Sequence, residues 1–196
     1  IQERGLHAGA GWRFALVGSL VGALMASAFT PWVAQWSNAW PALLAALAVA
    51  ALVALLHVAA RPGQGAWAGW GFGTAWLTGS TAWLYVSLHQ FGGLPAWMAV
   101  AAVLALSAAL SGYLALLGAA WVRWRRRQWG SDALLLGALW LLAEAARALI
   151  FTGFPWAATG YALVDSPLAA LAPWLGVYGL AQFMVTGVAA LVLAAC

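Results

Sequence analysis

Two oppositely charged residues, Glu144 and Arg147, lie three positions apart in an otherwise apolar stretch of this sequence. On a helix, that spacing places their side chains on neighbouring faces, close enough to pair. A charge inside a lipid bilayer costs about 2.5–3.5 kcal/mol on insertion scales, so each charge needs a partner or a polar cavity. Two interpretations stay open. The pair is either a clamp between helices or part of a polar pocket that receives a ligand.

A turn is predicted directly after this pair. Gly153, Phe154 and Pro155 cannot continue the helix, because proline fixes its own φ and disfavours helical backbone in the residue before it. The turn would return Trp156 to the membrane surface. A tryptophan ring at that depth is most simply an interface anchor.

A second polar and aromatic cluster lies earlier in the chain and contains Trp83, Tyr85, Ser87 and His89. Histidine can act as a general base near neutral pH. Ser87 and His89 lack a third residue that would orient them, so they do not form a catalytic triad. A solvated histidine at the membrane surface is the simpler interpretation.

No complete catalytic or metal-binding set is evident in this sequence. There is no lysine, and Cys196 has no activating neighbour in the sequence. The three histidines are His7, His57 and His89, and they are not spaced as metal ligands. We therefore expect no catalytic residue, no metal and no cofactor in this chain.

The elements that position these residues follow from composition. Hydrophobic residues make up 66% of the 196 residues and charged residues 6%, against roughly a quarter charged in soluble domains. This predicts an all-α fold, a polytopic bundle of transmembrane helices. Six spans are expected, at residues 13–30, 40–60, 66–88, 95–122, 132–151 and 169–195, separated by glycine- and proline-containing breaks.

The arginines predict the orientation of these spans. With six spans, one side of the membrane would hold nearly all of the arginines, namely Arg4, Arg13, Arg61 and the cluster at 123–127. The loops on the opposite side contain no arginine. By the positive-inside rule, both termini are cytoplasmic. This explanation of the basic balance leaves no need for a nucleic-acid partner. Most of the tryptophans, including Trp121 and Trp124, are expected to be interface anchors.

Several motifs resemble the apolipoprotein N-acyltransferase family. They are WLYVSLHQFGGLP at 83–95, the Glu144–Arg147 pair, TGFPW at 152–156, and GYALVDSPLAALAP at 160–173 with GVYG at 176–179. The resemblance covers almost the whole chain, in the order and spacing of the family. It implies an enzyme of the bacterial inner membrane that completes lipoprotein maturation. The acyl chain would come from a phospholipid and pass to the α-amino group of the acceptor's N-terminal diacylglyceryl-cysteine.

The resemblance also implies that the catalytic machinery lies elsewhere. In the family, a periplasmic nitrilase-like domain carries a Glu-Lys-Cys triad whose cysteine forms the acyl thioester. That domain follows the region matched here, so we expect residues 1–196 to be a transmembrane fragment, inactive alone, and Cys196 not to be the nucleophile. The chain begins with Ile1 and ends in an apolar run, which favours the same interpretation.

The remaining role for this chain would be substrate handling at the periplasmic side. Positioning or structural support is expected from the turn (Gly153, Phe154, Pro155, Trp156), from Glu144 and Arg147 beneath it, and from Trp83, Tyr85, Ser87 and His89. Two alternatives stay open: a small transporter that uses the ion pair along a solute path, or a non-catalytic membrane anchor.

Overall fold

A computed structural model describes residues 11–30, 37, 39–150 and 153–196. These residues form helices and connecting turns, with no strand among them. The long helices are α2 (Gly11–Ser27), α4 (Trp40–Val58), α5 (Pro62–Ser80), α7 (Ala96–Leu110), α8 (Gly112–Trp124), α9 (Trp129–Leu149) and α10 (Ala172–Ala195). The shorter ones are α6 (Trp83–Val86), the π-helix η1 (Ser87–Phe91), and the 3-10 helices η3 (Thr159–Leu163) and η4 (Pro167–Leu171).

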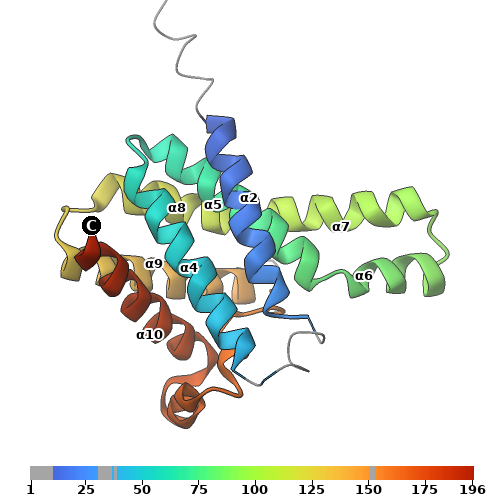
Figure 1. The fold of residues 1–196 in the computed structure, drawn as a ribbon. Helices are drawn as coiled ribbons and strands as arrows, with labels where there is room; N and C mark the ends of the chain where they lie inside the picture. Colours follow the sequence, from blue (N-terminus) through green and yellow to red (C-terminus); the bar gives the residue numbers. More distant parts are fainter. Residues whose placement is uncertain (1–10, 31–36, 38, 151–152) are drawn as a thin grey trace, which may run out of the picture.

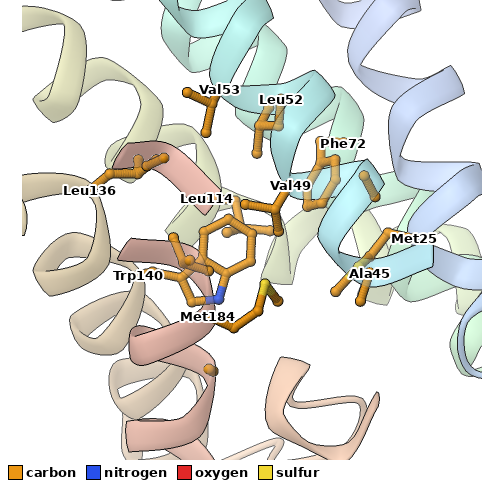
Figure 2. Packing of buried hydrophobic residues seen from close by; sticks show 14 of the residues in the cluster. Met25, Ala45, Val49, Leu52, Val53, Phe72, Leu114, Leu136, Trp140 and Met184 are labelled. Atoms are coloured by element: carbon orange, nitrogen blue, oxygen red, sulfur yellow. The ribbon is translucent and has the colours of Figure 1, made fainter. Parts of the chain in front are cut away.

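Six of the long helices pack as a closed circuit of neighbours. The order is α2, α5, α8, α9, α10 and α4, and α4 then packs back against α2. The middle of the circuit is filled by large apolar side chains. Figure 2 shows Trp140 of α9 beside Val49 of α4 and Met184 of α10, with Phe72 of α5 close by. The core is therefore shared by helices from all parts of the chain.

Helix α5 approaches its neighbours through glycines. A Cβ atom on Gly69 would overlap the backbone of Leu114 in α8, and one on Gly22 of α2 would overlap the backbone of Phe72. Small residues allow helix backbones to approach closely, which is how helices associate in lipid. The Gly18-x-x-x-Gly22 and Gly69-x-x-x-Gly73 spacings are weak evidence in the sequence alone, but here they lie at these two interfaces.

The seventh long helix, α7, lies outside the circuit. It pairs with α6 and η1 to form an arm that extends away from the other helices (Figure 1). The chain enters the arm where α5 ends at Ser80 and leaves it at Ser111, between α7 and α8. Within the predicted span 66–88, the backbone departs from helical geometry at Thr81 (φ −110°, ψ 18°). The predicted span 95–122 corresponds to α7 and α8, which join through helical backbone at Ser111 (φ −67°, ψ −11°) and together form one apolar segment, 96–124.

Among the described residues, three helical segments are long and apolar enough to cross a membrane: 40–58, 96–124 and 167–195. Helix α2 is also apolar but shorter. Most of the loop 31–39 lies outside the described residues, and so do residues 151–152, which include the end of the expected span 132–151. In its described part the chain is thus an all-helical membrane protein, while the expected number of six spans stays a prediction.

Tryptophans are divided between the core and the surface. Trp76, Trp121 and Trp140 are almost completely buried. Trp121 was expected to be an interface anchor, and that expectation is wrong: its indole N–H donates to the carbonyl oxygen of Asp132, 2.9 Å away. Trp124, three residues later, is 60% exposed and can serve as an anchor.

Arg125 joins two ends of the bundle. Its guanidinium donates to the carbonyl oxygens of Leu56 (2.9 Å), His57 (2.9 Å) and Ala59 (2.5 Å) at the end of α4. These are carbonyls that a helix end leaves without intrahelical partners. The sequence marks Arg125 only as a topology signal, whereas the structure shows that it also caps a distant helix.

Replacing Arg125 by alanine should therefore destabilise the protein by roughly 1–3 kcal/mol, because three carbonyls lose a charged donor. Thermal unfolding of the full-length protein would measure this loss. Arg123→Ala is the matched control, since Arg123 is exposed at the end of the same helix. Equal effects of the two substitutions would show that only the charge of the cluster matters.

Candidate functional site

The candidate site is the loop between α9 and α10, which begins at the predicted turn. Helix α9 ends at Leu149, and Gly153 then adopts φ 81°. A Cβ atom on Gly153 would overlap the carbonyl oxygen of Ala148, so this position requires glycine. After the turn, η3 and η4 carry the chain to α10.

Arg147 ties the turn to α9. Its guanidinium Nη1 donates to the carbonyl oxygens of Trp156 (2.6 Å) and Phe154 (3.3 Å). The backbone N–H of Phe154 donates in return to the carbonyl oxygen of Arg147, at 2.8 Å. One residue thus fixes both sides of the proline-containing turn.

Glu144 holds the next part of the loop. Its Oε1 atom accepts hydrogen bonds from the backbone N–H and from the hydroxyl of Thr159, both at 2.7 Å. The hydroxyl of Thr159 also accepts from the indole N–H of Trp140, at 3.1 Å. Glu144 and Arg147 themselves approach to 3.9 Å. The pair acts as a clamp, but what it clamps is the loop that follows rather than another helix.

Buried aromatic rings surround the pair. The Arg147 guanidinium lies 5.8 Å from the ring centroid of Trp76, and Trp76 stacks on Trp140 with centroids 6.2 Å apart. A guanidinium over an indole face is attracted by its π-system. Thr159, Trp76 and Trp140 were missed by the sequence analysis, because no charge or turn residue distinguishes them from their apolar neighbours.

The loop brings two sequence clusters together. The rings of Trp156 and Trp83 lie 6.2 Å apart between centroids, and those of Phe154 and Trp156 lie 5.5 Å apart. Trp156 and Trp83 are 52% and 46% exposed. A surface pocket of about 320 Å³ lies beside Trp156, lined by Pro155, Trp156, Ala157 and Tyr161. We call the exposed rings of Trp83 and Trp156, together with the half-buried ring of Phe154, the aromatic surface.

The other predicted residues lie on the arm rather than in the loop. His89 stacks on Tyr85 with centroids 5.4 Å apart. Its Nδ1 atom lies 2.7 Å from the carbonyl oxygen of Leu94. A carbonyl only accepts, so this nitrogen carries the proton. Ser87 is exposed and forms no side-chain hydrogen bond with another described residue. These contacts stabilise the end of the arm, and they do not assemble a nucleophile with a base.

The site and the arginine cluster lie at opposite ends of one helix. Helix α9 has 21 residues, which corresponds to about 30 Å. The arginine-rich turn precedes it, and the Trp156 turn follows it. Within the described part of the chain, no group of His, Cys, Asp and Glu could hold a metal ion. The described part of this site consists of the aromatic surface and of a loop held by Glu144 and Arg147.

Comparison with known proteins gives a family match over most of the chain. Residues 21–191 match the family model described as the apolipoprotein N-acyltransferase N-terminal domain. Proteins named apolipoprotein N-acyltransferase are similar to this chain: that of Ralstonia nicotianae is 45% identical over 138 residues, covering 68% of this chain and 26% of the relative. That of Verminephrobacter eiseniae is 44% identical over 136 residues (65% and 25%), and that of Pseudomonas putida 44% over 131 residues (64% and 26%). The chain spans about a quarter of the length of these relatives.

Proposed function

The chain belongs to the apolipoprotein N-acyltransferase family, and we propose that it forms the membrane part of an enzyme that N-acylates bacterial lipoproteins. In the complete protein, an acyl chain would pass from a phospholipid to the α-amino group of a diacylglyceryl-cysteine. The bundle would lie in the inner membrane with six spans, both termini cytoplasmic and the site loop periplasmic. The catalytic residues would belong to a nitrilase-like domain outside residues 1–196.

The observation that carries this proposal is the clamped loop. Arg147 and Glu144 hold the backbone on both sides of Trp156, and the ring of Trp156 lies beside Trp83 of the arm. A side chain held this way is preorganised, because little conformational freedom remains to be lost when a ligand binds. The aromatic surface would therefore position lipid-anchored substrates below the catalytic domain.

Preorganisation suits a reaction between two lipid-anchored substrates. Both substrates would keep their acyl chains in the bilayer, while their reacting groups must reach one external site in turn. Holding a substrate in the correct geometry converts a bimolecular step, in which the reactants must first find each other, into an effectively unimolecular one. The described residues contribute this positioning, and a covalent two-stage transfer would be completed by the other domain.

The transporter alternative has less support from the geometry. A solute path needs charges or broken helices that face a shared passage in several spans. Both Glu144 and Arg147 are almost completely buried. Their assigned hydrogen bonds, within the described residues, go to the loop at 154–159. A non-catalytic anchor would not require the aromatic surface at all, and the following experiment separates it from the enzyme.

Trp156→Ala in the full-length protein is expected to lower acyl transfer at least tenfold while leaving membrane insertion unchanged. The physical reason is that a small misplacement of a bound substrate lowers the reaction rate by a factor of this size. Transfer would be followed with a fluorescent phospholipid donor and a diacylglyceryl peptide acceptor. Trp40→Ala is the matched control, because Trp40 is 45% exposed at the start of α4. Equal losses of transfer and insertion would make Trp156 a simple anchor.

A further inference from the structure

A second pocket lies at the opposite end of α9 from the clamped loop. It has a volume of about 560 Å³ and lies where α8 passes into α9. Arg126, Ser131 and Asp132 line its polar part. Its apolar part is lined by Trp124, Leu134, Leu135 and Ala138. From Ser131 to Glu144, the rise of the helix amounts to about 20 Å. This pocket is therefore separate from the aromatic surface.

The turn that carries Arg126 is fixed by its own contacts. The buried side chain of Asp132 accepts the backbone N–H of Arg126 through Oδ1, at 2.7 Å. The carbonyl of the same aspartate accepts from Trp121 in the core. Arg125, the preceding residue, is held at the end of α4 by three carbonyls. The backbone at Arg126 is thus held at its own N–H and at the residue before it, and the exposed side chain of Arg126 lines the pocket.

The lining matches one kind of ligand. A guanidinium next to an apolar strip complements a phosphate attached to an acyl chain, and arginine binds phosphate oxygens well. The hydroxyl of Ser131 donates to the carbonyl oxygen of Gln128, at 3.2 Å, so Arg126 is the donor available to the phosphate. The net positive charge around the pocket also favours an anionic ligand. Residues 123–132 contain four arginines and one aspartate, and the carboxylate of that aspartate already accepts a backbone N–H. Basic pockets between membrane helices commonly bind the headgroups of anionic lipids.

We propose that this pocket binds an anionic phospholipid, with its phosphate at Arg126 and an acyl chain along Leu134 and Ala138. The lipid would lie in the leaflet on the arginine-rich side. It would connect the ends of α8 and α9 without taking part in acyl transfer. The proposal is independent of the proposed function, because it concerns lipid retained at the other end of the bundle.

The test measures retained lipid rather than activity. The full-length protein is reconstituted in nanodiscs that contain phosphatidylcholine with phosphatidylglycerol, and native mass spectrometry counts each lipid still bound after release. The wild type is expected to retain phosphatidylglycerol in preference to phosphatidylcholine. Arg126→Gln should reduce this preference about fivefold, which is the contribution of one arginine near a membrane surface.

Two further variants make the result specific. Arg123→Gln removes an exposed cation that does not line the pocket, and it should retain the wild-type preference. Ala138→Phe fills the apolar part without a change in charge, and it should lower retention of phosphatidylglycerol. Equal losses for Arg126→Gln and Arg123→Gln would show diffuse attraction to the arginine cluster and overturn the site. The same conclusion follows if the wild type shows no preference.

Discussion

Glu144→Ala in the full-length protein should destabilise the membrane domain by roughly 3–5 kcal/mol, as is typical when one partner of a buried ion pair is removed. Thr159 would lose the acceptor of its N–H and hydroxyl, and the Arg147 guanidinium would remain buried with less compensation. The loop would then no longer hold Trp156 in place. Acyl transfer should fall with stability, and thermal unfolding in detergent would measure the latter.

One further variant separates the charge of Glu144 from its hydrogen bonding, and a second variant is its control. Glu144→Gln keeps one oxygen that can accept from Thr159 and loses the charge, so an intermediate effect is expected. Asp165→Ala is the control, because Asp165 is an exposed carboxylate on the same loop, and it should change stability by less than about 0.5 kcal/mol.

A double-mutant cycle tests the pairing itself. Glu144→Ala combined with Arg147→Met should be less destabilising than the sum of the two single substitutions, by about 1–3 kcal/mol. This follows because the second change removes the charge that the first leaves uncompensated. Strict additivity would mean that the two residues hold the loop independently, and the clamp would then be the wrong description.

Gly69→Leu should prevent the domain from reaching its folded state. Its Cβ atom would overlap the backbone of Leu114, and a backbone cannot move aside as a flexible side chain can. The cost should exceed the roughly 1–3 kcal/mol that extra methylene groups usually cause in a packed core. The yield of monodisperse protein after size exclusion would report this loss.

Gly187→Leu is the matched control for that substitution. Gly187 lies in α10, and a Cβ atom there would meet nothing within 4 Å. Leucine should be tolerated at that position, because the side chain would point into open space. Comparable loss of yield for both variants would indicate a general effect of adding leucine, and close approach of α5 to α8 would not be the explanation.

The sequence alone determined the class of the protein. Its composition predicts a helical membrane protein. Gly153 and Pro155 predict the break after α9 that the structure contains. The motifs led to the family that the comparisons show. These features are local or compositional, so they can be recognised without knowing which helices are neighbours.

Only the tertiary structure decided what the charged and aromatic residues contact. Glu144 accepts from Thr159, Arg125 caps α4, and Trp83 lies beside Trp156. The last two of these contacts join residues far apart in the sequence. A tryptophan in the sequence looks the same whether its ring lies at the membrane surface or in the core, which is why Trp121 was assigned to the wrong environment. The physical reason is that lipid-facing and core-facing positions are equally apolar, so hydrophobicity cannot tell which side of a membrane helix faces its neighbours.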